Sequence, residues 1–268
     1  INRLPIDPVG FGDGGIGPMV EMGAGIVGGL QVGYSKLSYD LYVSNGPQLI
    51  YPNPAPGADT RWGQMQYEMF GNNNKSQAVG GRIGFLPLSN SSLELGVSGQ
   101  YKNSTGDTAY TNVSVLFYAV DLSYFKKIDA IGSTVRLLGE YKVMNVGNGG
   151  NYSAYILDSA HSQSVTMTSN AWYGQLSIRP TQVENDILKN IEIVGRYSQF
   201  TPPAGTATLV PGGLWGVDKD VISQLAVGIN YWLRWDAVLK FSYTSQDGNY
   251  ASNSLAGQRF NAQIVYRF

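Results

Sequence analysis

Apolar and polar residues alternate without interruption through residues 259–268, the final stretch of the sequence. At a period of two residues, one face of an extended strand carries Phe260, Ala262, Ile264, Tyr266 and Phe268. The opposite face carries Arg259, Asn261, Gln263, Val265 and Arg267. The pattern therefore predicts a β-strand with one face suited to an apolar environment and one suited to water.

The same alternation recurs upstream and predicts eleven strands, at residues 24–34, 37–44, 78–86, 93–102, 112–125, 133–144, 171–179, 191–200, 221–234, 237–246 and 258–268. Residues 1–23 are rich in Pro and Gly and are expected to be irregular. Ser35 and Lys36 are expected to form the tight turn of the first hairpin. The predicted connections alternate between short and long, so we expect the long ones to gather at one end of the sheet.

Composition narrows the class of protein. Charged residues make up 14% of the chain, whereas about 25% is usual in a soluble domain. No run of residues approaches the roughly 18 apolar positions of a membrane-spanning helix. Strands that alternate in polarity, with long loops at one end and short turns at the other, are typical of transmembrane barrels. We therefore predict an all-β fold: a transmembrane antiparallel up-and-down β-barrel with about eleven or twelve strands in this chain.

Two stretches resemble known proteins. The terminal strand, with Ile264, Tyr266 and Phe268, resembles the assembly signal of bacterial outer-membrane β-barrels, an alternating strand that ends in phenylalanine with an aromatic residue two positions earlier. Residues 2–5 (Asn-Arg-Leu-Pro) with the Gly-rich stretch that follows, and residues 43–47 (Val-Ser-Asn-Gly-Pro), resemble the region after the pore-constricting loop in phosphate-selective porins of Gram-negative bacteria.

This resemblance implies a sixteen-stranded barrel in the cell outer membrane, usually a trimer, with about five strands upstream of this chain. It fits the even strand number of bacterial barrels, because eleven strands cannot close such a barrel alone. Residues 1–23 would then lie on the extracellular side or in the lumen. The implied partners are outer-membrane lipid, the barrel assembly machinery, and further copies of the chain or a larger envelope complex. A net charge of -1 gives no indication of a nucleic-acid partner.

The strand faces opposite the apolar ones are expected to line the lumen. They carry ten basic residues, Arg82, Lys102, Arg136, Lys142, Arg179, Arg196, Arg234, Lys240, Arg259 and Arg267. Against these stand five acidic residues, Asp40, Glu94, Asp121, Glu140 and Glu192. Charges around a narrow aqueous pore bias which ions enter it, so we expect passive diffusion of small hydrophilic solutes with a weak preference for anions. The alternative is that these charges pair across strands and only hydrate the wall.

Two other functions remain open. The chain could form a sheath around a partner protein, with inward apolar residues as the contact: Val27, Leu86, Val115, Phe117, Leu138 and Trp232. The sequence His161-Ser-Gln-Ser also resembles the His/Ser pair of outer-membrane phospholipases. However, a nucleophile needs a base and a third orienting group, and His161 lies in a predicted loop. With this single histidine and no cysteine, we expect no enzyme activity, no metal site and no cofactor.

Overall fold

The computed structural model describes residues 4–11, 15–17, 21–49, 65–66, 76–106, 113–147, 151–153, 162–164, 167–205, 221–234, 236–250, 253–254 and 257–266. The fold is all-β and is dominated by one antiparallel sheet of eleven strands, in which each strand pairs with the next long strand along the chain. These strands are β1 (Gly23–Val32), β2 (Ser35–Ser44), β5 (Ala78–Leu86), β6 (Leu93–Lys102), β7 (Val115–Ile128), β8 (Ser133–Val146), β11 (Met167–Arg179), β12 (Ile191–Gly205), β13 (Ile222–Trp232), β14 (Ala237–Asp247) and β17 (Gly257–Tyr266). The up-and-down order and the eleven strands agree with the prediction.

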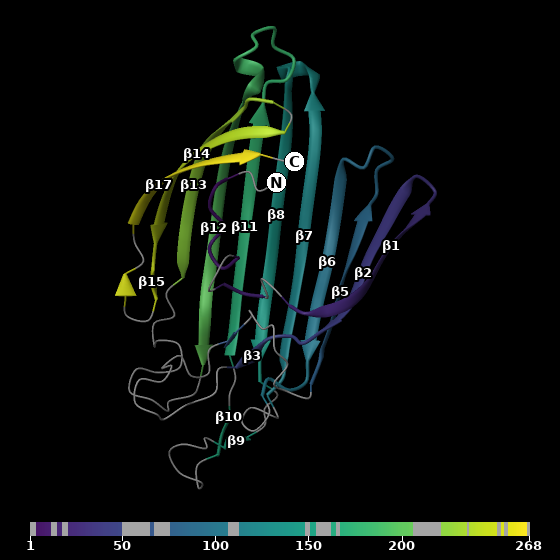
Figure 1. The fold of residues 1–268 in the computed structure, drawn as a ribbon, viewed down its shortest axis with the longest axis vertical. Coiled ribbons are helices and arrows are strands. Elements are labelled where there is room, and N and C mark those ends of the chain that lie inside the picture. Colours follow the sequence, from purple (N-terminus) through teal and green to yellow (C-terminus); the bar gives the residue numbers. More distant parts are fainter. Residues whose placement is uncertain are drawn as a thin grey trace.

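The strand ends that are separated by long stretches of sequence lie at one end of the sheet, and those joined by short turns lie at the other (Figure 1). Sequence alternation did not predict the three pairs of short strands within the long connections. These are β3 (Gln48–Leu49) with β4 (Met65–Gln66), β9 (Asn151–Ser153) with β10 (Ser162–Ser164), and β15 (Asn249–Tyr250) with β16 (Asn253–Ser254). Two of the short turns contain single-turn 3-10 helices, η1 (Asp129–Ile131) and η2 (Leu188–Asn190).

The first hairpin turns two residues earlier than expected. Val32 pairs with Ser35, so Gly33 and Tyr34 form the turn, and Ser35 and Lys36 already belong to β2. Gly33 has a φ of 60°. Tight two-residue hairpins favour glycine at such a position because their twist matches that of the flanking strands. The prediction that Ser35 and Lys36 form the turn was therefore wrong.

The pair β11–β12 extends further than the alternation indicates. Met167 pairs with Gly205 and Thr168 with Ala204, and the register then shifts between Thr168 and Asn170. This irregularity falls where β12 contains two consecutive prolines at 202–203. Proline cannot donate to a regular ladder and is tolerated at such bulges.

The two faces of the sheet have opposite character. On one face, apolar residues such as Val97, Leu225 and Ile229 are 61%, 51% and 51% exposed. On the other face, polar residues such as Ser198 and Asn230 are almost fully buried. A protein folded in water usually shows the reverse arrangement. We call the exposed apolar face the outer face and the opposite one the inner face.

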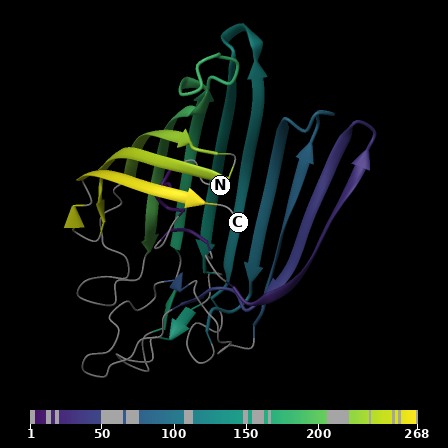
Figure 2. The same ribbon diagram turned by 45° about the horizontal axis from the view of Figure 1, so that its top comes forward.

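The sheet curves so that its inner face is concave (Figure 2). Within the described residues, β1 and β17 form its two edges, since β1 pairs with β2 and β17 with β14. Residues 4–11 and 15–17, which we call the inner strap, cross the concave side without forming a helix or strand. Leu4, only 1% exposed, packs in a small apolar cluster with Val194 and Ala226 on the inner face.

A second apolar cluster closes over the inner face near the long connections. It joins the inner-face residues of β7, β8, β11, β12 and β13 to residues from the strap and the loops: Ile16, Leu49, Met65, Val113, Val115, Phe117, Met144, Val146, Ala171, Phe200 and Ile222. The inward apolar positions Val115 and Phe117 are therefore covered by residues of the same chain.

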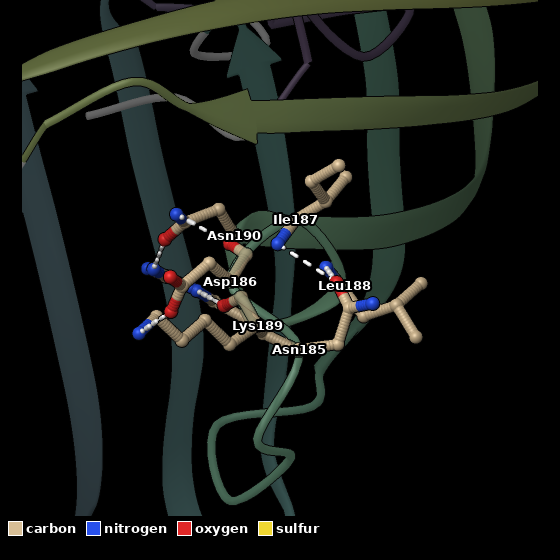
Figure 3. Close-up of polar contacts among 7 residues, drawn as sticks. Asn185, Asp186, Ile187, Leu188, Lys189 and Asn190 are labelled. Atoms are coloured by element: carbon tan, nitrogen blue, oxygen red, sulfur yellow. Dashed lines mark hydrogen bonds and ion pairs between the residues drawn. The ribbon is translucent and has the colours of Figure 1, made fainter.

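The connection between β11 and β12 is built from local polar contacts (Figure 3). The Asn185 Oδ1 atom accepts hydrogen bonds from the main-chain N–H groups of Ile187 at 2.9 Å and Leu188 at 3.1 Å. This is the usual way in which an asparagine side chain stabilises a turn. Three residues apart, Lys189 donates to the carboxylate of Asp186. The hydrogen bond from Lys189 holds the pKa of Asp186 below its ordinary value.

We predict that Lys189→Met raises the pKa of Asp186 toward its ordinary value, because it removes both the hydrogen bond and the positive charge. The pair stabilises the turn above the ordinary pKa of Asp186, and this contribution is lost as the pH falls through the lowered one. An NMR titration of the carboxyl carbon measures the change. Lys127→Met, next to the last residue of β7, serves as the control and should leave Asp186 unaffected. An unchanged pKa in Lys189→Met would disprove the role of this pair.

Candidate functional site

The inner strap is attached to the inner face through its own main chain. The Arg196 guanidinium on β12 donates from Nη2 to the carbonyl oxygen of Ile6 at 2.7 Å. Two strands away, the Lys142 ammonium on β8 donates to the carbonyl oxygen of Ile16. The N–H of Val9 donates to the Ser198 hydroxyl at 3.3 Å. Cationic donors make stronger hydrogen bonds than neutral ones, so Arg196 and Lys142 are the principal anchors of the strap.

Aromatic contacts and a close backbone approach add to these bonds. Lys142 Nζ lies 4.0 Å from the centre of the Phe11 ring, and Phe11 meets Tyr173 edge-on with ring centres 4.9 Å apart. Gly10 has a φ of 79°, and a Cβ there would come within 2.6 Å of Ala171 Cβ. Only glycine combines this backbone conformation with such a short separation from the wall.

A charged cluster occupies the inner face of β5, β6 and β7. Arg82 on β5 reaches Asp121 Oδ1 at 2.6 Å and Glu94 Oε1 at 2.9 Å through Nη2, and Asp121 Oδ2 at 3.1 Å through Nε. Gly96 makes room for this cluster, because a Cβ at that position would lie 2.1 Å from Asp121 Oδ2. One guanidinium is therefore shared by two carboxylates, which leaves one negative charge in excess, and its bidentate contact with Asp121 has the preferred geometry of such pairs.

A cavity of about 200 Å³ lies between the strap and the inner faces of β2, β6, β7 and β8. Its lining residues are Ile16, Gly17, Tyr42, Ser98, Gly99, Gln100, Phe117, Tyr118, Ala119, Glu140, Lys142 and Val143. The inner-face side chains thus give the cavity one carboxylate, one ammonium, two hydroxyls and an amide, whereas the side chain of Tyr118 lies on the outer face. The ring of Tyr42 lies so close over Gly80 that a Cβ there would come within 2.5 Å of its Cζ atom.

Among the residues predicted to line a lumen, the register places thirteen on the inner face: Asp40, Arg82, Glu94, Lys102, Asp121, Arg136, Glu140, Lys142, Arg179, Glu192, Arg196, Lys240 and Arg259. Arg234 differs from the prediction: β13 ends at Trp232, and Arg234 lies in the following turn, 3.4 Å from Asp236. Arg267, Phe268 and His161 lie outside the described residues.

The inner-face charges do not form one continuous group. Arg82, Glu94 and Asp121 meet directly, whereas Lys142 and Arg196 bind the strap. Lys102 is fully buried and donates to the carbonyl oxygen of Asn45 at 2.5 Å. Glu192 and Arg179 have hydrogen-bond partners near the short turns. Glu192 accepts from Asn230 and Trp232, and Arg179 donates to the carbonyl oxygen of Lys189.

Sequence reasoning missed the strap as the opposite wall of the site. Residues 1–23 were expected to be irregular and to lie on the extracellular side or in the lumen, but nothing in their sequence indicated that part of them would form one wall of a cavity. Tyr42, Gln100 and Phe11 were also missed, because a single tyrosine, glutamine or phenylalanine gives no signal until the fold brings the strands and the strap together. For Tyr42 and Gln100, the alternation along each strand predicted only the face of the sheet on which the side chain lies.

The described part of the chain contains no group of three or more His, Cys, Asp or Glu residues placed to hold a metal ion. Its helical segments include none with the length and apolar character needed to cross a bilayer.

We predict that loss of the Arg196 anchor exposes the start of the strap. The protein contains no cysteine, so a Leu4→Cys variant carries one thiol, buried at the inner face, and should react slowly with a polar maleimide. Adding Arg196→Met should raise the labelling rate at least several-fold, because it removes the hydrogen bond to Ile6. Tyr34→Cys, in the exposed β1–β2 turn, is the control and should react rapidly with or without Arg196. Equal rates for Leu4→Cys in both backgrounds would exclude an anchoring role.

Comparisons of the chain with protein-family models, with curated proteins and with solved structures found no match.

Proposed function

We propose that this protein is an outer-membrane porin that allows passive diffusion of small hydrophilic solutes, with a weak preference for anions. The observation that carries the proposal is the inverted distribution of polarity: exposed apolar side chains on the outer face and buried polar and charged side chains on the inner face. A strand that faces lipid on one side and a wet lumen on the other has this character.

The organisation of the sheet supports the same proposal. In hydrocarbon every main-chain N–H and C=O must be paired, so sheets span membranes only as closed barrels. A curved up-and-down sheet with long connections at one end is suited to being part of such a wall. We propose that the edges at β1 and β17 are joined in the full protein by further strands, giving the sixteen-stranded barrel that the resemblance implies. The outward Ile264 and Tyr266 of β17, 69% and 53% exposed, fit the proposed assembly signal.

The anion preference rests on how the inner-face charges are balanced. The charge of Arg82 is more than offset by the carboxylates of Asp121 and Glu94, whereas Lys142 and Arg196 donate to main-chain oxygens, which carry no net charge. A cation bound to a neutral acceptor keeps its full charge, and low-polarity walls extend its field into the lumen. Asp7 interacts electrostatically with Arg196 and acts in the opposite sense, as do Asp40, Glu140 and the excess carboxylate of the Arg82 cluster, so we expect the preference to be weak.

The alternative function, a sheath around a partner protein, receives no support from the second apolar cluster of the inner face. Val115 and Phe117, which could have contacted a partner protein, are covered by Ile16, Leu49 and Val113 of this chain. We therefore propose the diffusion channel in preference to the sheath and to an enzyme, and we propose that it works without a cofactor. Association into trimers remains part of the proposal drawn from the resemblance.

We predict that the purified full-length protein gives stepwise conductance in planar bilayers, with a reversal potential displaced toward that of chloride under a KCl gradient. Lys142→Met should reduce the displacement because it removes an inner-face charge. Lys189→Met removes the same charge from the exposed β11–β12 turn and should have a smaller effect. A reversal potential displaced toward that of potassium would contradict the proposed preference. Failure to conduct would contradict the porin itself.

We also predict that neighbouring positions on β6 lose very different amounts of stability when a charge is added. Val97→Arg places a guanidinium on the outer face near the middle of the strand and should lower the free energy of unfolding in lipid by about 2–4 kcal/mol. Ser98→Arg, on the inner face, should change stability much less. Urea unfolding in lipid vesicles, followed by tryptophan fluorescence, measures both variants. Equal losses of stability would indicate that the outer face does not contact hydrocarbon.

A further inference from the structure

The cavity beside the inner strap is lined by a carboxylate and an ammonium group from the same strand. Glu140 and Lys142 both lie on β8, and their side chains line one space of about 200 Å³. Residues two apart on a strand project from the same face, about 6–7 Å from each other. Their charged groups are not in direct contact, because they form no ion pair within 4.0 Å among the described residues. The cavity therefore presents two opposite charges with space between them.

The Glu140 carboxylate makes no hydrogen bond or ion pair with the described residues. Its neighbour across the ladder is Asp121, a second acid. Arg82 is already engaged with Asp121 and Glu94, so it supplies no direct partner to Glu140. A half-buried carboxylate beside another acid is best satisfied by a positively charged hydrogen-bond donor. An ammonium group entering the cavity would meet this requirement.

The Lys142 ammonium retains donor capacity. It has three N–H donors, of which one is directed to the carbonyl oxygen of Ile16, and the face of the Phe11 ring lies 4.0 Å away. Both partners lie on the strap, whereas Lys142 also lines the cavity. A carboxylate in the cavity could therefore accept a further hydrogen bond from Lys142 without displacing the strap.

The remaining walls and the size of the space restrict the ligand. The hydroxyls of Tyr42 and Ser98 and the amide of Gln100 add polar partners, and the Phe117 ring adds an apolar surface. A volume of 200 Å³ corresponds to about seven water molecules at roughly 30 Å³ each. This is smaller than the pockets of about 300–1,000 Å³ that hold drug-sized ligands. The ligand must be small, with its positive and negative groups close together.

We propose that this cavity is a binding site for a small zwitterionic amino acid. Its ammonium group donates to Glu140, and its carboxylate accepts from Lys142 and the neighbouring hydroxyls. The route by which the solute reaches the cavity rests on the proposed porin function, whereas the binding site itself rests on the residues of β2, β6, β7, β8 and the strap. The site deepens the function of the pore by giving it one preferred class of solute.

The test measures binding of three probes to the purified full-length protein in detergent by saturation-transfer NMR: glycine, ethanolamine and acetate. Glycine carries both charges, and the other two each carry one. We expect glycine to bind more tightly than either. Glu140→Gln should weaken glycine binding at least tenfold because it removes the negative partner, while Asp40→Asn, which removes an inner-face acid outside the cavity, should leave it unchanged. Equal binding of all three probes, or an unchanged affinity in Glu140→Gln, would overturn the proposal.

Two further measurements keep the interpretation unambiguous. Labelling of Leu4→Cys in the Glu140→Gln background shows whether the strap is still in place, and slow labelling means that a lost affinity reports the carboxylate itself. Conductance of the same preparation separates the two proposals. Channels that conduct but do not bind glycine would overturn the amino acid site and leave the porin standing. Glycine binding without conductance would support the site and contradict the porin.

Discussion

The hydrogen-bonded ladder between neighbouring strands is the constraint on which the rest of the structure depends. It pairs the main chain of eleven strands, in regular register except at the shift between Thr168 and Asn170, and it fixes which side chains point to each face. Because successive side chains alternate, a shift of one residue would move the apolar set inward and the charged set outward. The inverted polarity of the two faces is therefore a direct consequence of register, and so are the positions of the strap anchors and the cavity.

The inner face is organised by a second rule, which is that buried polar groups must find partners. Lys102, Lys142 and Arg196 use main-chain oxygens of Asn45, Ile16 and Ile6 for this purpose. The bonds from Lys142 and Arg196 hold the inner strap across the concave side and against the wall. The carboxylates of Glu94 and Asp121 find their partner in a side chain instead, because both bind the guanidinium of Arg82. Glu140 is left beside open space, and this difference between acids on adjacent strands is what makes the cavity a binding site.

The sequence predicts the sheet well because each strand encodes its own faces. Alternation alone located all eleven strands, and the bounds of β5 and β6 agree with the structure to the residue. Ends were less predictable where local conformation decides them. Gly33 places the first turn two residues closer to the N-terminus than predicted. The irregular register between Thr168 and Asn170 allows β11 and β12 to extend past the point where the alternation stops.

The site could be predicted only in part. Alternation placed Glu140 and Lys142 on one face, but it gave no information on which charges meet across strands. That depends on register and on spaces such as the one at Gly96, where the absence of a Cβ admits Arg82 and Asp121. The strap has no period at all, so its position follows from tertiary contacts made by Leu4, Gly10 and Phe11. No local pattern in the sequence encodes those contacts.

The most direct test of the account asks whether the outer face contacts hydrocarbon. Spin labels placed one at a time along β13 (Ile222–Trp232) of the full-length protein in lipid vesicles report collision with oxygen, which concentrates in lipid, and with a nickel chelate, which stays in water. Labels at Leu225, Val227 and Ile229 are predicted to collide more with oxygen, and labels at Gln224 and Asn230 to show no such preference. If the three outer positions collide with the nickel chelate as freely as a label at Tyr34 in the exposed turn, the outer face lies in water and the account is wrong.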